Sequence, residues 1–246
     1  MHHSSLGTRG KAEKSRRAIL EAATAEFADA GIAGARIDAI AKAAGVNKAL
    51  LYYYYHDKEA LYGAALEHTV GGLLEQLVRI LDADHTPGFK VLAYALTHFN
   101  YVAAHPHYRR MIQHEMMRAG TGESRHFKKL VHEFFRPLLH RLTEVLEGGI
   151  EAEEFRHVDV PQFVQSMIAV VVFYFTAAPV VRAVAGFDPL STQALDRRRR
   201  AMLDFVSGAL FVSHSHAART AEVVLAGTGE ADISGTKARR VKKEVR

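Results

Sequence analysis

The chain has 246 residues, of which 48% are hydrophobic and none is a cysteine. The missing cysteines exclude disulfide scaffolds, thiolate metal sites and cysteine nucleophiles, and they fit a reducing cytoplasm. The formal net charge is +5, but residues 237–246 alone carry a net charge of +5. The basic balance is therefore poor evidence for nucleic-acid binding by the folded part of the chain.

The first residues contain no apolar core of the kind that a secretory signal peptide needs. We expect residues 1–10 to be disordered and the protein to be cytoplasmic. Farther along, residues 163–181 form a 19-residue stretch without a charged side chain. Its length is marginal for crossing a bilayer, which favours a helix buried on several sides over a membrane span. The sequence therefore predicts no membrane partner.

Three short helices are predicted at the front of the chain. Apolar residues recur at helical spacing in each of them, and a glycine ends each of the first two. Asn47 suits the N-cap of the third helix, because its side-chain oxygen can accept a hydrogen bond from a helix amide. The apolar positions are Ile19, Leu20, Ala23 and Phe27 before Gly31, then Ile37, Ile40, Ala41 and Ala44 before Gly45, then Leu51 and Tyr55.

A longer helical region fills the rest of the chain. One helix is expected from Lys58 to about Leu81, and the other helical runs are at 89–104, 106–118, 123–148, 160–178 and 190–226. Gly148-Gly149 is one of the breaks between them, and no stretch alternates as a strand would. The sequence predicts an all-α protein of about nine helices. Its divisions are a disordered start in 1–10, a three-helix domain in 11–57, a larger helical domain in 58–226 and a disordered basic tail in 227–246.

The spacing of Ala41, Gly45 and Leu51 is that of a helix-turn-helix. A small residue lets two helices cross closely, glycine supplies the positive φ of the turn, and a large aliphatic residue fills the shared core. Many antiparallel helix pairs contain a glycine, so the pattern alone is only moderately specific. A supporting helix and a basic segment in residues 9–17 precede it, which favours nucleic-acid binding.

Four consecutive tyrosines occupy residues 52–55 of the third helix. A helix advances about 100° per residue, so four adjacent rings sweep around the whole cylinder and cannot all be buried. With Leu51 at zero, Tyr55 falls about 40° away and belongs to the core. The outer face then holds Ala49, Leu50, Tyr52 and Tyr53. Tyrosine hydroxyls can donate to phosphates and apolar groups can contact thymine methyls, although the rings, Tyr54 above all, could instead pack on the following domain.

The run from Gly45 to Leu61, GVNKALLYYYYHDKEAL, closely resembles the recognition-helix signature of the TetR/AcrR transcriptional regulators. In that signature Gly-Val-Ser-Lys leads to Leu-Tyr and aromatic residues, and Ser-Lys-Glu-Ala-Leu closes the motif. The specific resemblance covers about residues 14–66, and beyond it only helix count, helix lengths and the His105-Pro106 break agree. The resemblance implies a DNA-binding domain, a homodimer and a pocket for a small-molecule effector.

The resemblance also implies which residues contact DNA. By position these are Lys48, Ala49, Leu50, Tyr52, Tyr53, Tyr54 and Lys58. Arg36 stands where a Ser or Thr commonly caps the second helix; arginine cannot cap, but it could contact a phosphate. Leu50 stands where a polar base-reading residue is common, and His56 replaces a frequent proline. We therefore expect phosphate contacts and DNA shape to matter more here than polar base readout.

Two further sites in the larger domain are implied by the resemblance. The last two helices would form the dimer interface, where Gly208, Ala209, Val212 and Ser213 would permit close approach, although an ordinary monomer core fits them too. An effector pocket needs apolar walls with a few polar tips. The candidates are Phe99, Tyr101, Met111, His114, Met117, Phe134, Phe173 and Tyr174, and for any single one of them a place in the core is the simpler interpretation.

The remaining motifs do not support an enzyme. His114-Glu115 and His132-Glu133 begin like the zinc-protease motif, but arginine stands where the second histidine ligand is needed, so no metal or cofactor is predicted. No nucleophile–base arrangement or phosphate loop is recognisable. In the run Arg197–Arg200, pairing of Arg200 with Asp196 and Asp204 at i,i+4 spacing favours a solvated helix over a nucleic-acid site.

We predict a homodimeric one-component transcriptional regulator, in the first place a repressor, that a small-molecule effector releases from a palindromic operator in double-stranded DNA. A two-fold dimer fits such operators, because one recognition helix reads few bases and a second copy doubles the contact. An activator of the same family and a helical interaction protein that does not bind DNA are the alternatives.

Overall fold

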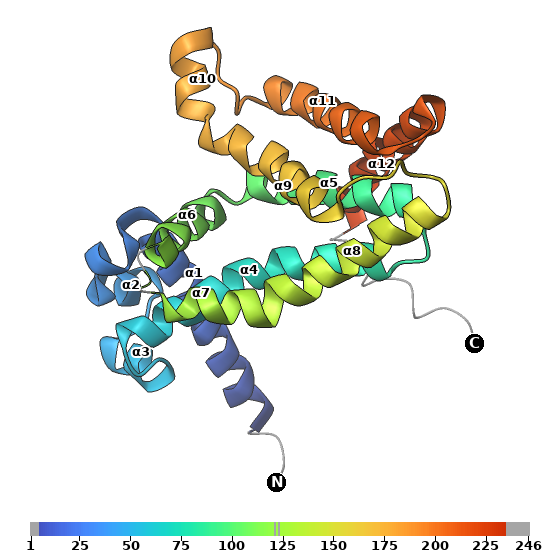
Figure 1. Ribbon diagram of the computed structural model, residues 1–246. Coiled ribbons are helices and arrows are strands. Elements are labelled where there is room, and N and C mark those ends of the chain that lie inside the picture. Colours follow the sequence, from blue (N-terminus) through green and yellow to red (C-terminus); the bar gives the residue numbers. More distant parts are fainter. Residues whose placement is uncertain (1–4, 121, 123, 235–246) are drawn as a thin grey trace, which may run out of the picture. The chain divides into compact units, whose positions relative to one another are not determined.

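The computed structural model describes the backbone of residues 5–120, 122 and 124–234, and the side chains of residues 10–120, 122 and 124–227. Helices dominate this part of the chain (Figure 1), as the sequence predicted. Their bounds are α1 Ser5–Gly34, α2 Ile37–Ala43, α3 Lys48–Tyr54, α4 Lys58–Asp82, α5 Pro87–Ala104, α6 Pro106–Gly120, α7 Arg125–Leu130, a π-helical turn Val131–Phe135, α8 Arg136–Glu151, α9 Val160–Thr176, α10 Ala178–Ala185, α11 Thr192–Leu210 and α12 His214–Ser234.

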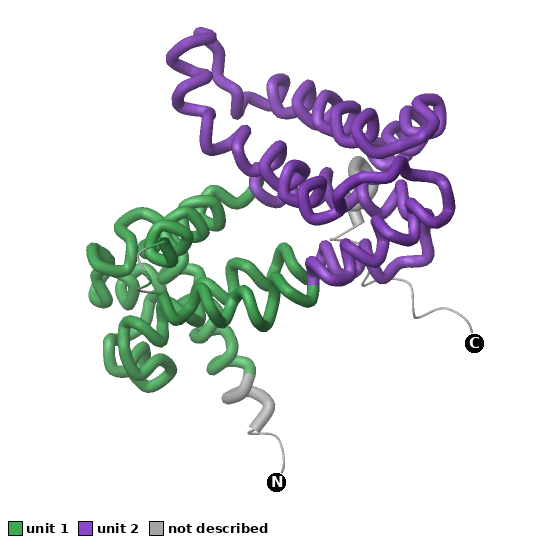
Figure 2. Tube along the Cα trace, in the orientation of Figure 1, with its two compact units in different colours: residues 1–75, 104–137 green, residues 76–103, 138–246 purple. Residues whose placement is uncertain are grey.

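The chain divides into two compact units, coloured separately in Figure 2. Unit 1 comprises Met1–Glu75 and Ala104–Pro137, and unit 2 comprises Gln76–Ala103 and Leu138–Arg246. The sequence placed its boundary at residue 58 instead. The α6 helix packs on α1, so it lies in unit 1 with the first three helices. The predicted division by function is a separate matter and stays a prediction.

The core of unit 1 is built on the apolar stripe of α1. Ile19, Ala23 and Phe27 are fully buried, as their helical spacing predicted. The ring of Phe27 meets the ring of Tyr62 from α4 edge to face, with 5.1 Å between their centroids. This contact fixes the first turns of α4 against the helix that supports the helix-turn-helix.

The core of unit 2 is built around α5, which is buried along most of its length. Its Phe99 packs on Phe175 of α9, with ring centroids 5.0 Å apart. At one end of the unit, the ring of Phe155 lies against Phe211 and against the backbone of Gly149. A Cβ at position 149 would lie 2.2 Å from that ring, so glycine permits the close approach. The α8 helix continues through Gly148-Gly149 to Glu151, where the sequence predicted a break.

Several predicted boundaries differ from the structure. The expected helix 190–226 is two helices, α11 and α12, separated at Phe211–Ser213. The α12 helix continues to Ser234, into the segment expected to be disordered, and α1 already begins at Ser5. The predictions for residues 1–4 and 235–246 lie outside the described residues.

The uncharged stretch 163–181 is divided between α9 and α10, which meet at an angle of 59°. In the part of the chain that the structure describes, no single helix is long and apolar enough to cross a membrane; these two helices meet that criterion only as a bent pair. The sequence predicted a helix buried on several sides. The α9 helix instead buries one stripe (Val160, Val164, Met167, Val171 and Phe175) and leaves Phe173 67% exposed.

Candidate nucleic-acid interface

The turn between α2 and α3 has the geometry that the sequence predicted. Gly45 has a φ of +66°, a left-handed conformation that glycine adopts without steric cost. The amides of Gly45 and Val46 donate to the carbonyls of Lys42 and Ala41, at 3.2 and 3.0 Å, and close the end of α2. Leu51, fully buried, fills the core beneath the turn. The chain thus enters α3 with its direction fixed.

Asn47 and Arg36 both occupy helix N-cap positions, but only Asn47 has a side chain that can cap the helix. The side chain of Asn47 accepts a hydrogen bond of 2.7 Å from the amide of Leu50 and caps α3. Arg36 occupies the N-cap position of α2 without a capping side-chain bond, and its own amide donates to Glu26 at 2.9 Å. The Arg36 side chain is exposed and is not used to hold the helix.

The structure divides the tyrosine run as the helical wheel predicted. Tyr53 is 76% exposed and Tyr52 is 39% exposed, whereas Tyr55 is 5% exposed. Tyr55 is the C-cap of α3 and has an extended backbone, so its ring turns inward. Burial raises the pKa of its hydroxyl. Ala49 is exposed and Leu50 is half-buried, which completes an outer face without an acidic side chain.

Tyr54 lies at the boundary between these two groups. Its hydroxyl donates to the carbonyl of Ala12 in α1 across 3.5 Å. Its ring meets that of Tyr53 edge to face at 5.4 Å and lies 6.4 Å from that of Tyr55. The buried ring and the contact with α1 therefore hold the exposed ring of Tyr53 in position.

The charged residues beside α3 are partly engaged within the protein. Lys48 forms an exposed ion pair of 2.9 Å with Asp38, in the first turn of α2. The hydrogen bond with Asp38, followed by its charge, raises the pKa of the Lys48 ammonium. The ammonium of Lys58 donates to the carbonyl of Ala33 at 3.1 Å. Sequence reasoning did not single out Asp38, because only the fold brings it next to Lys48.

Two family models match this chain. The model described as "Bacterial regulatory proteins, tetR family" covers residues 19–65, which include the helix-turn-helix. The model described as "Tetracyclin repressor-like, C-terminal domain" covers residues 90–206. The chain belongs to the TetR family.

Individual relatives of this TetR-family chain agree with the models. The HTH-type transcriptional repressor SCO4008 of Streptomyces coelicolor is 40% identical over 117 residues, which are 46% of this chain and 56% of that protein; this chain thus spans little more than half of that relative. The HTH-type transcriptional regulator RutR of Escherichia coli is 27% identical over 190 residues, 76% of this chain and 87% of that protein. The crystal structure of SCO4942 from Streptomyces coelicolor, described as a transcriptional regulator, superposes with a TM-score of 0.59 at 25% identity and covers 80% of this chain and 98% of that one.

A buried polar network joins α4 to α6 and α7 in unit 1 of the TetR-family chain. The carboxylate of Glu115 is 1% exposed and accepts a hydrogen bond of 2.8 Å from the Tyr62 hydroxyl. Ser124, the N-cap of α7, also donates to it. Arg118 pairs with Glu115 at 3.7 Å and with Glu59 of α4 at 3.3 Å. Burial and then the bond to Glu115 raise the pKa of Tyr62. Glu115 of the sequence motif His114-Glu115 therefore belongs to a structural network. Among the described residues, no three His, Cys, Asp or Glu side chains could hold a metal ion.

The eight residues predicted to line an effector pocket fall into both units. Unit 1 contains Met111, His114, Met117 and Phe134, and unit 2 contains Phe99, Tyr101, Phe173 and Tyr174. Met111 is fully buried, and Met117 is 70% exposed. Within unit 2, the ring of Phe99 lies 5.8 Å from that of Tyr174, and Phe173 and Tyr174 line one hollow. Of the eight predicted residues, the structure therefore brings Phe99, Phe173 and Tyr174 together.

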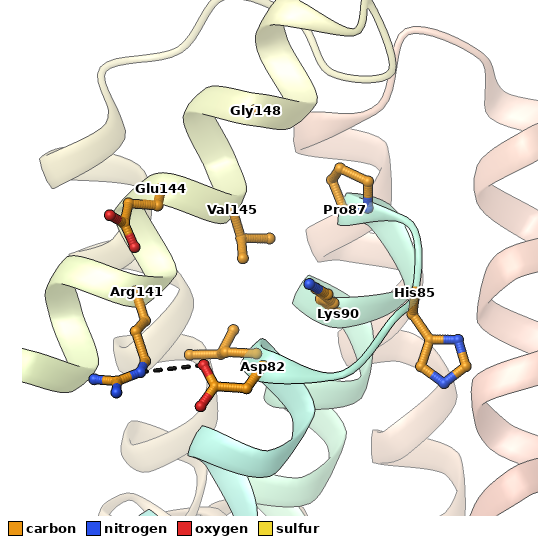
Figure 3. A pocket seen from close by; sticks show the side chains of 9 residues that line it. Asp82, His85, Pro87, Lys90, Arg141, Glu144, Val145 and Gly148 are labelled. Carbon is orange, nitrogen blue, oxygen red and sulfur yellow. Dashed lines mark hydrogen bonds and ion pairs between the residues drawn. The ribbon is translucent and has the colours of Figure 1, made fainter.

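A second hollow of about 360 Å³ lies where the end of α4 and the start of α5 face α8. Figure 3 shows Arg141 and Glu144 on the α8 wall, with Pro87 and Lys90 opposite them. The charges here are mixed, and Arg141 is already paired with Asp82 at 3.2 Å. This hollow therefore offers no single charge for a ligand to satisfy.

Proposed function

We propose that this chain is a one-component transcriptional repressor that binds a palindromic DNA operator as a homodimer and is released by a small-molecule effector. The observation that carries the proposal is the outer face of α3, which is aromatic, free of acidic side chains and held on a closed helix-turn-helix. The relatives named above, a transcriptional repressor and a transcriptional regulator, support the same function. A protein that binds chromosomal operators in bacteria acts in the cytoplasm, which is the proposed location.

The proposed DNA contacts divide into two kinds. Tyr52, Tyr53 and Tyr54 present hydroxyls that can donate to phosphates, and Ala49 and Leu50 present apolar groups that can contact thymine methyls in the major groove. Three cationic side chains, Arg36, Lys48 and Lys58, would flank this face and contact phosphates. Lys48 would exchange Asp38 for a phosphate on binding. An ammonium has three donors, so Lys58 could keep its bond to Ala33 and still meet a phosphate.

The proposed dimer uses the exposed faces of α9 and α11. Phe173 of α9 and Phe205 of α11 are 67% and 60% exposed, and a second copy would cover both. The sequence assigned the close approach to Gly208, Ala209, Val212 and Ser213. Val212 and Ser213 lie in the break between α11 and α12, and the carbonyls of Gly208 and Ala209 accept bonds from Arg156. We therefore propose that the dimer contact is made by the faces of α9 and α11 that expose Phe173 and Phe205.

The proposed release acts through α4, which begins at Lys58 directly after the α3 turn. Its first turns are tied to α6 and α7 by the network around Glu115. The protein would exchange between a DNA-binding and a non-DNA-binding conformation, and a ligand favours release only if it binds the second conformation more tightly. A coupling free energy of about 1–3 kcal/mol between the ligand site and the DNA site is usual.

The test is a gel-shift titration of the purified chain against the DNA upstream of its own gene, at several salt concentrations. We expect a complex whose affinity falls steeply with salt, because phosphate contacts release counterions. A folded, dimeric protein that binds no such fragment in a salt-dependent way contradicts the proposal. Transcription from the same fragment in vitro separates a repressor, which lowers it, from an activator, which raises it.

A further inference from the structure

A hollow of about 400 Å³ opens on α9, α10 and α11 of unit 2. Its walls are apolar or aromatic except at one point. The lining residues are Ala169, Val170, Phe173, Tyr174, Ala177, Val181 and Arg198, and of these Arg198 alone is charged. Its volume lies at the lower end of the range of about 300–1,000 Å³ that small-molecule sites occupy.

Arg198 differs from the two arginines that follow it in the chain. Arg199 pairs with Asp196 at 2.5 Å and donates to Asn100 at 2.7 Å. Arg200 pairs with Glu222 of α12 at 3.1 Å. These contacts replace the i,i+4 pairs that the sequence predicted. Among the described residues, by contrast, no carboxylate pairs with Arg198.

The guanidinium of Arg198 is held in place but keeps unused donors. Its Nη2 donates to the carbonyl of Val170 at 2.7 Å, and its carbon lies 5.0 Å from the centre of the Tyr174 ring. The Nε is buried and has no hydrogen-bond partner among the described residues. Burial lowers the pKa of this group, but an arginine stays protonated at neutral pH. The hollow thus contains a fixed positive charge without a counter-charge.

The aromatic wall beside this charge is also held. The hydroxyl of Tyr174 donates to the carbonyl of Pro189 at 2.5 Å, and the ring centroid of Phe99 lies 5.8 Å from that of Tyr174. Phe173 remains 67% exposed. The site therefore combines a rigid cation, a rigid ring and an uncovered ring.

We propose that this hollow binds a small organic monocarboxylate with an aromatic or branched apolar body, whose carboxylate pairs with Arg198. Guanidinium groups match planar carboxylates with parallel hydrogen bonds, while the Phe173 and Tyr174 rings contact the apolar body. A phosphate ester carries a charge of about −1.5 to −2 at neutral pH, which a single cation does not balance. As an account of the effector, the inference rests on the proposed function; as an account of a binding site, it stands on this geometry alone.

A second copy of the chain is the competing occupant, because the hollow borders the proposed dimer face. In the proposed dimer the second copy would cover Phe173 from outside, but an apolar side chain of that copy inserted into the hollow would bury the charge of Arg198 without a counter-ion, which is costly. The carboxylate ligand satisfies both features and is therefore favoured.

The experiment is calorimetric titration of the full-length protein with 2-naphthoate and, as the neutral match, 2-naphthamide, without DNA. We expect naphthoate to bind at least about tenfold more tightly than the amide, because a hydrogen bond to a charged group is stronger than a neutral one. Arg198→Met should lose this preference. Arg197→Met, which removes the same charge from an exposed neighbour, should keep it.

Four results would overturn the inference: equal binding of acid and amide, no binding of either, loss of binding by both arginine variants, or unchanged naphthoate binding by Arg198→Met. A change of oligomeric state in Arg198→Met, measured by sedimentation, together with unchanged naphthoate binding, assigns the hollow to the partner copy. If Arg198→Met does not fold, Ala169→Phe provides the second test, since it fills the hollow from an exposed position and should also abolish binding. Operator binding in the absence of naphthoate is measured separately, so failure of the ligand site and failure of the DNA-binding proposal are distinguishable.

Discussion

The outer face of α3 and the outer face of α9 expose aromatic rings to a similar extent but with different chemistry. Tyr53 is 76% exposed and Phe173 is 67% exposed. The tyrosine ring carries a hydroxyl that water or phosphate can satisfy, whereas the phenylalanine ring offers only apolar surface. A hydrated, charged partner such as DNA fits the outer face of α3, and an apolar partner fits the outer face of α9. The exposed fraction alone therefore does not identify a partner; the chemistry at the tip of the side chain does.

The largest expected effect is on stability, and it distinguishes the buried Leu51 of α3 from the exposed residues on the outer face of the same helix. Leu51→Ala removes a fully buried side chain and should lower the free energy of unfolding by about 3 kcal/mol. Tyr53→Ala, two residues away, should change it by less than about 0.5 kcal/mol, because the ring is exposed. Chemical denaturation of both variants measures this. Equal losses would show that Tyr53 belongs to the core.

The second test asks whether the two exposed rings, Phe173 and Tyr53, contact different partners. Phe173→Asp should raise the dimer dissociation constant by about 100-fold, because it removes apolar contact area and places a charge in an apolar interface. Tyr53→Asp should leave the dimer intact. Sedimentation equilibrium measures both, with Val223→Asp on the exposed side of α12 as the matched control. A dimer that tolerates Phe173→Asp excludes the proposed α9 interface.

The third test concerns the buried interior of unit 2. Burial lowers the pKa of His98 to about 4 from an ordinary value of 6.5, so between these values the unfolded chain binds a proton that the folded chain does not. Stability should therefore fall as the pH is lowered from 7 to 4, by about 2–3 kcal/mol from this residue. His98→Phe should lose less stability over the same range. Thermal unfolding at stepped pH measures it, and identical pH profiles of variant and wild type would contradict the assignment.

The smallest effect refines the α3 face. Asp38→Asn frees Lys48 and removes a negative charge beside the proposed phosphate contacts, so operator affinity should rise about threefold. Glu144→Gln, the same charge change on an exposed part of α8, should have a smaller effect. Fluorescence anisotropy at low salt resolves the difference. Weaker DNA binding by Asp38→Asn would mean that the pair with Asp38 positions Lys48 for binding.

The accuracy of the sequence predictions depended on the range of the interactions. The cap by Asn47, the φ of Gly45 and the division between Tyr53 and Tyr55 depend on residues within one or two turns, so helical spacing was sufficient to predict them. The bond between Tyr62 and Glu115 joins residues 53 positions apart. The fit of the Phe155 ring on Gly149 also depends on tertiary packing.

The candidate ligand residues show the same limit. Helical spacing assigned Phe99, Phe173 and Tyr174 to helices but could not show which of them share a hollow. Arg198 was missed because four consecutive arginines were interpreted together as a solvated run. Only the fold shows which acids pair with Arg199 and Arg200, and that Arg198 instead faces the aromatic wall. The sequence therefore predicted two aromatic members of the hollow, Phe173 and Tyr174, and missed its charged member, Arg198.

The central claim is that the outer face of α3 contacts DNA, and anisotropy titrations of the operator across a salt series test it most directly. Lys48→Ala removes one phosphate-binding ammonium from each protomer, so the slope of log affinity against log salt should become shallower by about 0.9 per ammonium removed. Tyr53→Ala should weaken binding at every salt concentration and leave the slope nearly unchanged, and Met117→Ala, exposed on α6, serves as the control. A Lys48→Ala/Tyr53→Ala double variant that binds the operator with the affinity and slope of the wild type would contradict the account.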